Sequence, residues 1–363
     1  MSERTLTFAQ AILEATDQCL AADPSVILIG EGVPDPKGIF GTTSGLRDKY
    51  GPSRVSDMPV SENGLTGILV GAALRGLRPI LTHQRVDFSI LSFDQLFNNA
   101  SKWHAMFGGR ASVPLTVRMI IGQGWGQGAQ HAQNLHAVFS HVPGLKVVMP
   151  ATPADAKGLL ISAVRDPNPV VFIEHRWLHG VSGPVPEGGA AVPLGQARVA
   201  RQGKDVTLVA SSWMTLQAQR VAGWLETMGV QAEVVDLRTL SPLDAETVLG
   251  SVRKTGRVLV MDLGWRHCGY AAEVLARIAE TLHGQLRAAP ARLTLPDEPA
   301  PSSPALARAY YPSARRMLGE ALAAAQHPHA RDESSWPEPV RAELARLEAL
   351  PADVPDLSFK GPF

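Results

Sequence analysis

The sequence has few cysteines and no excess of charge of either sign. Its 363 residues include two cysteines, Cys19 and Cys268, which form no disulfide framework and no metal-binding spacing. A reducing, cytosolic (cytoplasmic) location is therefore the simpler expectation. Lysine plus arginine number 34, as do aspartate plus glutamate, so the chain offers no electrostatic footprint for nucleic acid or an anionic membrane.

Long apolar runs are also missing. No stretch approaches the roughly 20 apolar residues that span a bilayer, and the first residues, with charges inside their apolar stretch, resemble no signal peptide. Hydrophobic residues make up 45% of the chain, which is enough for sizeable cores. Charged residues make up 19%, against about 25% in typical soluble proteins. This low fraction fits a subunit that buries much of its surface against other chains.

Short apolar runs alternate with helical patterns through most of the chain. Fully apolar strands separated by helices indicate an α/β fold, with parallel sheets covered by helices on both faces. The expected strands are 26–29, 79–82, 113–117, 146–149, 170–173, 206–210, 232–236, 257–261 and 291–295. The expected helices are 8–20, 64–76, 93–107, 154–165, 214–229, 242–253, 270–283, 304–325 and 338–350.

The same pattern divides the chain into parts. Residues 181–195 are rich in glycine and proline and poor in periodicity, which predicts a linker between domains 1–180 and 196–326. Residues 327–363 change character again and are expected to form an extension with one docked helix. A chain of this length fits two domains at about 150 residues each.

Taken singly, the candidate functional residues leave two interpretations open. Glu62 starts an apolar helix, where the helix dipole favours a carboxylate, so it is either a helix-start residue or a functional acid. The glycine-rich segment 122–128 matches neither the dinucleotide nor the phosphate-loop pattern and is either a plain loop or a ligand-binding one. His131, His136 and His141 lack zinc spacing, but a catalytic histidine after a strand is possible.

The order and wording of longer segments resemble the beta subunit of the thiamine-diphosphate-dependent 2-oxo acid dehydrogenases, the decarboxylating first component of the pyruvate, branched-chain and acetoin enzymes. The resemblance covers about residues 5–325 in collinear order. It is carried by GEGVPDPKGIFGTTSGLRDKYG, MPVSENGLTGILVGAALRGLRPI, DFSILSFDQLFNNASKWHAMFGG, HVPGLKVVMPATPADAKGLLISAVRDPNPVVFIEH, RVLVMDLGWRHCGYAAEVLARIAE, LPDEPAPSSPAL and AYYPSARRM.

This resemblance implies a transketolase-like pyrimidine-binding domain followed by a smaller α/β transketolase C-terminal domain. It implies that Glu62 is catalytic and binds the aminopyrimidine nitrogen of thiamine diphosphate, where a carboxyl group supports acid–base coupling. It implies further that Phe88 packs on the pyrimidine ring, although core packing is the ordinary role of such a residue. His131 corresponds to the family's active-site histidine.

The resemblance also implies metal sites. The family binds a structural potassium ion, and the matching positions here are Leu115, Ala163, Val164, Asp166 and Asn168, mostly through backbone carbonyl groups. By sequence alone the last two belong to an ordinary turn. The superfamily's magnesium motif, Gly-Asp-Gly followed by asparagine, is missing. Magnesium is therefore expected on a partner alpha subunit, with the cofactor bound between chains in an α2β2 heterotetramer.

The activity implied is decarboxylation of a 2-oxo acid, with transfer of the acyl group to a lipoyl domain of an acyltransferase. Some residues depart from the family pattern. Arg85 replaces an aromatic residue and either binds an acidic substrate or pairs with Asp87. Trp125 and residues 177–180 also differ. These changes leave open a transketolase-like carboligase that transfers a two-carbon unit to an aldehyde, and, as a further alternative, a non-catalytic assembly subunit.

Overall fold

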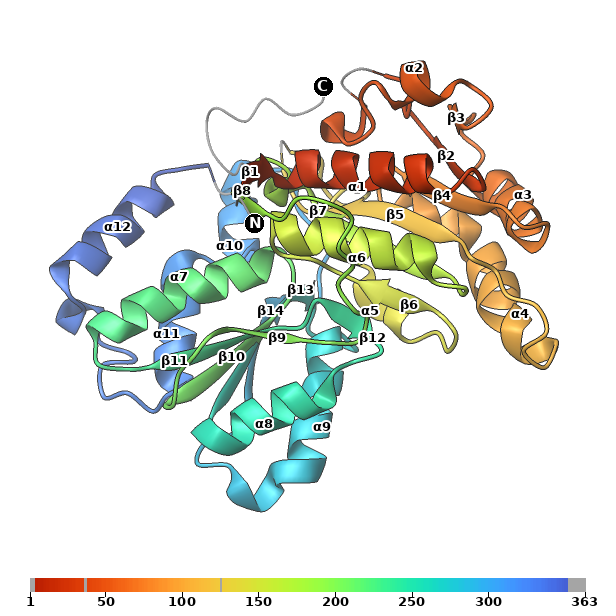
Figure 1. Ribbon diagram of the computed structural model, residues 1–363. Helices are drawn as coiled ribbons and strands as arrows, with labels where there is room; N and C mark the ends of the chain where they lie inside the picture. The colour runs from red at the N-terminus through yellow and green to blue at the C-terminus, as the bar shows by residue number, and fades with distance from the viewer. Residues whose placement is uncertain (1–3, 36–37, 125, 352–363) are drawn as a thin grey trace.

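The computed structural model describes residues 4–35, 38–124 and 126–351. Within them the chain forms two large open sheets, joined through the segment near residue 195 (Figure 1), and one additional two-stranded sheet. The first sheet has seven strands and the second has five, and both are parallel apart from one edge strand each. The expected α/β class is therefore confirmed.

The strand order places the strands as follows. The first sheet runs β12 (Thr239–Ser241), β6 (Lys146–Val148), β7 (Val170–His175), β5 (Thr116–Ile121), β4 (Arg78–His83), β2 (Val26–Gly30), β3 (Val55–Ser56). The second sheet runs β14 (Ala291–Leu295), β13 (Val258–Trp265), β10 (Val206–Ala210), β11 (Ala232–Asp236), β9 (Arg198–Arg201). In the centre of each sheet, every residue of β5, β7, β10 and β11 is buried, because helices cover both faces.

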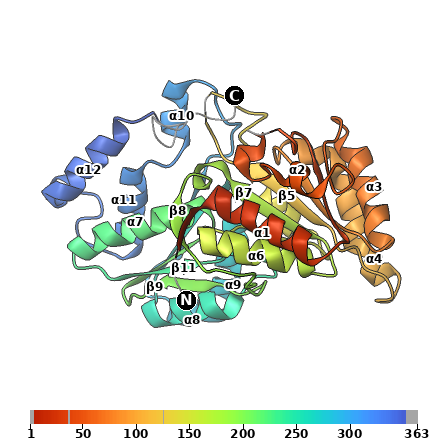
Figure 2. The ribbon, with the colours of Figure 1, turned by 45° about the horizontal axis from the view of Figure 1, so that its top comes forward.

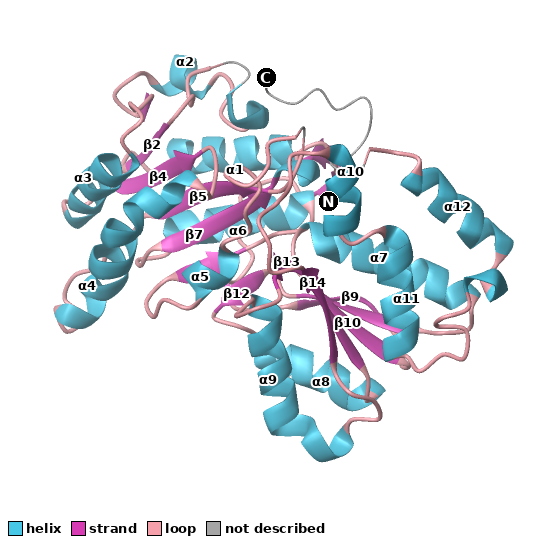
Figure 3. Cartoon of the chain, turned by 180° about the vertical axis from the view of Figure 1, so that it is seen from behind, coloured by secondary structure: helices cyan, strands magenta, loops and turns pink. Residues whose placement is uncertain are grey.

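Helices form the outer layers of both sheets. α1 (Phe8–Ala22) and α6 (Pro153–Arg165) lie side by side on one face of the first sheet, which Figure 2 shows from another angle. Seen from behind in Figure 3, α3 and α4 lie on the opposite side. The other helices are α2 (Leu46–Tyr50), α3 (Glu62–Leu74), α4 (Ser101–Met106), α5 (His136–Ser140), α7 (Trp213–Thr227), α8 (Ala245–Thr255), α9 (Tyr270–Leu282), α10 (Pro304–Tyr310), α11 (Ala314–Ala324) and α12 (Glu338–Glu348).

Local sequence fixes where the two packed helices begin. Thr7 caps α1 by accepting a hydrogen bond from the Gln10 backbone at 3.1 Å, while the Gln10 side chain accepts one from the Thr7 backbone at 2.8 Å. This reciprocal pair satisfies two backbone N–H groups that a helix start leaves without partners. Thr152 caps α6 in the same way, by accepting from the Asp155 backbone at 3.2 Å.

Some expected elements differ from those found. The strand expected at 113–117 is β5, Thr116–Ile121, because Pro114 cannot donate to a ladder and the Leu115 N–H donates back to the Val113 carbonyl at 2.8 Å. The helix expected at 304–325 is two helices, α10 and α11, separated at Pro312, which cannot donate a helical hydrogen bond. The helix expected at 93–107 begins with a π-helical stretch, Asp94–Ala100.

Five short strands had no signal in the sequence pattern, and two of them, β3 and β9, are edge strands of the seven- and five-stranded sheets. β1 (Arg4–Thr7) pairs antiparallel with β8 (Ser182–Val185), so the segment expected to be an irregular linker carries a strand. β12 follows the second domain's β11, yet it pairs antiparallel with β6 and extends the first sheet. These pairings depend on partners far away in the chain, which short polar segments do not reveal.

The C-terminal extension is docked as far as residue 351. Trp336, Val340 and Leu344 are buried against the second domain, and the Trp224 indole donates to Glu343 at 2.9 Å. Figure 1 shows α12 beyond α7 and α11, at the end of the molecule away from α3 and α4. The remainder of the predicted extension, residues 352–363, lies outside the described residues.

Candidate active site

The candidate site lies along the carboxyl edge of the first sheet. Glu31 directly follows β2, Arg85 and Phe88 follow β4, His131 lies in the loop after β5, and Arg176 directly follows β7. Parallel strands present their carboxyl ends at one edge, and open α/β sheets bind ligands in the crevice there. The topology thus gathers residues that are up to 145 positions apart in the chain into one region.

Glu62 and Glu31 form a pair of acidic side chains at this edge. Glu62 is the first residue of α3 and is 4% exposed. Burial raises the pKa of Glu31, and the charge of Glu62 and a hydrogen bond with it raise that pKa further. Glu31 Oε1 is buried and has no hydrogen-bond partner within the described part of the chain. Such a pair shares protons more readily than two isolated carboxylates.

Phe88 and His131 are in direct ring contact. Their ring centroids are 5.2 Å apart and the planes meet at 79°, an edge-to-face arrangement. Phe88 begins a short 3-10 helix, Phe88–Ser92, that packs against α3, and the residue is 38% exposed. The structure therefore brings the expected cofactor-packing residue and the expected histidine together, on elements adjoining the helix that carries Glu62.

Two buried arginines fix the loop that carries His131. Arg85 donates to the Gln127 side-chain oxygen and, at 3.3 Å, to the His131 carbonyl. Arg176 donates to the same two acceptors, at 2.7 Å and 3.3 Å. Burial lowers the pKa of Arg85 to about 10, and the nearby charge of Asp87 opposes that shift. Asp87 itself accepts a hydrogen bond from the Gln133 backbone at 3.2 Å.

The direct pairing of Arg85 with Asp87 is not formed, and the binding of an acidic substrate by Arg85 stays a prediction. Its guanidinium is directed into the 122–135 loop, and no ion pair within 4.0 Å joins it to Asp87 among the residues described. The two side chains interact only through their charges. Trp125, the other departure in this loop, lies outside the described residues.

Sequence reasoning missed Glu31, Gln127 and Arg176. Each follows the end of a buried strand or lies in the glycine-rich loop, so a search for polar residues after parallel strands would have found them. Their convergence could not have been read from spacing. Arg176 and Gln127 are 49 positions apart, and only the pairing of β5 with β7 places them together.

Another buried charge cluster supports the same two strands. Arg118 of β5 donates to both oxygens of Glu174 of β7, at 2.6 Å and 3.0 Å, and His179 contacts Glu174 at 2.9 Å. Burial acts against the charge of Glu174, but the charges and hydrogen bonds of Arg118 and His179 prevail and lower its pKa to about 2. Arg118 also donates to Thr42 at 2.9 Å, which ties the loop after β2 to the sheet.

The residues expected to ligate potassium gather around the end of α6. The Leu115 carbonyl accepts from the Val170 backbone at 2.9 Å. The Val164 and Asp166 carbonyls both accept from Arg78, at 3.0 Å and 3.2 Å. The side-chain oxygen of Asn168 is buried and has no partner among the described residues. The fifth residue, Ala163, lies in the last turn of α6, where carbonyl groups and the helix dipole favour a cation.

No group of three or more histidine, cysteine, aspartate or glutamate side chains within the described ranges has the geometry to hold a metal ion. None of the helices described has the length and hydropathy that a membrane span requires.

Two family models match the chain. Residues 4–180 match the transketolase pyrimidine-binding domain, and residues 195–317 match the transketolase C-terminal domain. A solved structure of a split-gene transketolase, titled an inactive beta4 tetramer, superposes with a TM-score of 0.72 at 24% identity. It covers 88% of this chain and 99% of its own, and at this identity it supports the fold alone.

Curated relatives are similar over most of their length. The beta subunit of acetoin:2,6-dichlorophenolindophenol oxidoreductase from Cupriavidus necator is 45% identical over 88% of this chain and 97% of its own. The protein of the same name from Bacillus subtilis is 39% identical, also over 88% of this chain and 97% of its own. A mitochondrial pyruvate dehydrogenase E1 component subunit beta-2 from Oryza sativa is 41% identical, over 85% and 83%.

Proposed function

The chain belongs to the transketolase-like family of 2-oxo acid dehydrogenase beta subunits, and we infer that it supplies half of a thiamine-diphosphate-dependent active site. The assembled enzyme decarboxylates a 2-oxo acid and passes the acyl group to a lipoyl domain. The observation that carries this proposal is the gathering of Glu62, Phe88 and His131 at one sheet edge. The expected cytosolic location stays a prediction.

The residues at this edge fit the pyrimidine half of the cofactor. Glu62 would hold the aminopyrimidine nitrogen, and its buried position beside Glu31 favours proton exchange there. The exposed face of Phe88 would pack on the ring, and His131 would contact the substrate or assist proton movements. When bound, thiamine diphosphate supplies the nucleophilic carbon and the electron sink that decarboxylation requires.

An exposed apolar surface next to these residues suits the alpha subunit. Val60, Ile68, Ile90 and Leu91 are all exposed, and they lie just before α3, on α3 and on the 3-10 helix that packs against it. Exposed apolar side chains grouped on packed elements mark an interaction surface. The alpha subunit would cover this surface and bring magnesium to the diphosphate end, completing an α2β2 heterotetramer.

Co-expression with a candidate alpha subunit from the same genome tests the proposal. The purified complex should bind thiamine diphosphate with magnesium and release carbon dioxide from pyruvate or a branched-chain 2-oxo acid. Reductive acylation of an added lipoyl domain identifies the dehydrogenase reaction, whereas ligation to an added sugar aldehyde without it identifies a carboligase. Full turnover by the alpha subunit alone would leave this chain an assembly role and contradict the proposal.

Potassium is proposed at the end of α6, held by Leu115, Ala163, Val164, Asp166 and Asn168. Each carbonyl oxygen has a second lone pair that is not used by its present hydrogen bond. The buried side-chain oxygen of Asn168 accepts no hydrogen bond from the described residues, so it is available to a cation. Arg78 and Lys146 already bring positive charge to Asp166, so the ion would bind against their repulsion. A thermal melting temperature that rises with potassium chloride, but not with equal sodium chloride, would support this site.

A further inference from the structure

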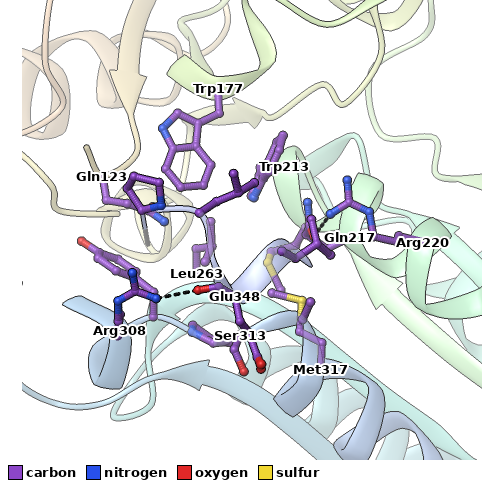
Figure 4. Close-up of a pocket in the computed structure, with 17 residues that line it drawn as sticks. Gln123, Trp177, Trp213, Gln217, Arg220, Leu263, Arg308, Ser313, Met317 and Glu348 are labelled. Atoms are coloured by element: carbon purple, nitrogen blue, oxygen red, sulfur yellow. Dashed lines mark hydrogen bonds between the residues drawn. The ribbon is translucent and has the colours of Figure 1, made fainter. Parts of the chain in front are cut away.

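A cavity of about 440 Å³ lies where the C-terminal extension meets both domains. Its lining comes from the loop after β5, the turn after β7, the start of α7, the junction of α10 with α11, and the end of α12 (Figure 4). The volume is within the range of small-molecule sites. None of Glu62, Phe88 and His131 lines it.

Two tryptophans form an aromatic corner of this cavity. The rings of Trp177 and Trp213 are perpendicular, at 89°, with centroids 5.3 Å apart. His175 stacks against Trp213 at 15° and supports it from within the protein. Apolar side chains of Leu263 and Met317 continue the wall, and Figure 4 shows both facing the same space as the tryptophans. A planar apolar group fits such a corner.

Unpartnered polar atoms occur inside the cavity wall. Gln123 is 5% exposed, and its Oε1 has no hydrogen-bond partner among the described residues. The same holds for the indole N–H of Trp177. A buried donor or acceptor left unpaired destabilises a protein, so each such atom in a native structure calls for a ligand, a water or another explanation. Both residues line the cavity, and these two atoms are closed off from solvent within its wall.

The charge at the cavity is positive. Arg220 and Arg308 line it and are exposed to solvent. The single acid in the lining, Glu348, has both carboxylate oxygens occupied by Arg315, at 2.7 Å and 2.9 Å. Arg308 donates to the backbone carbonyl of Glu348 at 2.7 Å, and Arg220 makes a long contact of 3.4 Å with Gln217. Two guanidinium groups therefore remain available to an anion.

We propose that this cavity is a binding site for a small amphipathic carboxylate with one planar aromatic group. The ring would lie in the corner of Trp177 and Trp213, and the carboxylate would meet Arg220, whereas Arg308 adds positive charge at the opposite side of the cavity. The extension supplies part of the wall through Leu347, Glu348, Leu350 and Pro351. These residues lie beyond the match to the transketolase C-terminal domain, which ends at residue 317.

Calorimetric titration of the full chain with indole-3-acetate tests the site. We expect one saturable site per chain with a Kd below about 1 mM. The neutral indole-3-acetamide should bind about tenfold more weakly, because it lacks the charge that the arginines recognise. No saturable binding, or equal affinity for the acid and the amide, would overturn the proposal. The titration needs no turnover, so its outcome is independent of the proposed catalytic function.

Three variants place the binding in the cavity. Arg220→Gln should weaken indole-3-acetate about tenfold, whereas Arg253→Gln, at an exposed arginine of α8 outside the lining, should leave it unchanged. Ala314→Phe fills the cavity from the start of α11 and should abolish binding. Thermal melting of each variant verifies the fold. Unchanged affinity in a folded Ala314→Phe protein would show that the ligand binds elsewhere.

Discussion

Arg85 and Arg176 share both of their acceptors, the side-chain oxygen of Gln127 and the backbone carbonyl of His131. Both arginines are buried, and they come from the ends of different strands, β4 and β7. The 122–135 loop, which carries both acceptors, therefore cannot shift without leaving the two buried guanidinium groups short of hydrogen bonds. Such a loss would destabilise the folded protein. This clamp sets the position of His131 against Phe88.

Replacing one arginine of the clamp should lower activity through the position of His131. For Arg85→Met we expect kcat of the assembled enzyme to fall about tenfold or more, with a smaller change in the KM for thiamine diphosphate. Arg85→Lys should restore little of the lost kcat, because an ammonium group cannot donate to both acceptors with the geometry of the planar guanidinium. Arg253→Met on α8 is the matched control. Full kcat in the lysine variant would contradict a positioning role.

Glu62→Gln should reduce turnover by at least about 100-fold, the scale of a general acid–base contribution. The variant keeps the size of the side chain and its place at the start of α3. Glu246→Gln, another acid in the first turn of a helix, controls for the loss of a favourable helix-dipole interaction. Steady-state rates with saturating cofactor and magnesium measure the effect. Unchanged turnover would remove Glu62 from the chemistry.

The pairing of Glu31 with Glu62 predicts a change in pH dependence. Burial, with the charge and hydrogen bond of Glu62, raises the pKa of Glu31, so Glu31 takes up a proton at higher pH than an exposed glutamate. Glu31→Gln removes this titrating group, so the acid limb that it contributes to the kcat/KM profile should move to lower pH. A profile that keeps its acid limb while its height falls would show that Glu31 acts only structurally.

Phe88→Ala should weaken cofactor binding by up to about tenfold, since edge and stacking contacts of aromatic rings contribute about 0.5–1.5 kcal/mol. The substitution removes both the exposed ring face and the contact with His131. Phe107→Ala, at a phenylalanine exposed after α4, is the control. Titration of the assembled enzyme with thiamine diphosphate gives the comparison. Equal affinities for the two variants would assign Phe88 to packing alone.

Buried His83 should make stability depend on pH. Burial lowers its pKa to about 4, so the unfolded chain binds the proton at a higher pH than the folded one. The contribution of neutral His83 to the free energy of unfolding is complete above the unfolded pKa of about 6.5. That contribution is lost as the pH falls from about 6.5 to about 4. His83→Leu should therefore be more stable relative to the native chain at about pH 5 than at about pH 7.5. Urea unfolding at both values measures this, and an equal difference would contradict it.

Much of the fold was readable from local pattern. The strands 206–210, 232–236 and 291–295 were predicted to the residue, because continuous β-branched and aliphatic runs occur where a parallel sheet is buried on both faces. β12 and β8 were not readable, since a three- or four-residue edge strand has no periodicity of its own. Pro312 marks a helix break in the sequence, but the helical pattern on both sides of it led to the prediction of one continuous helix over 304–325.

The family resemblance was likewise carried by sequence, and the comparisons confirm it. Collinear motifs identified a transketolase-like beta subunit and selected Glu62, Phe88 and His131 from many similar residues. The roles of these residues remain predictions, but their proximity is a structural finding. Spacing alone could not have given it, because Phe88 and His131 follow different strands.

The sequence by itself determined the two α/β domains, the positions of their buried strands along the chain and the acid at the start of α3. Each of these depends on residues that are adjacent in the chain. Only the tertiary structure decided that Arg85 and Arg176 share Gln127, that Glu31 faces Glu62, and that the extension closes a cavity beside Trp177 and Trp213. Each of these contacts joins side chains from distant segments. Their energies depend on strand register and burial, which are set only when the sheets and helices pack together.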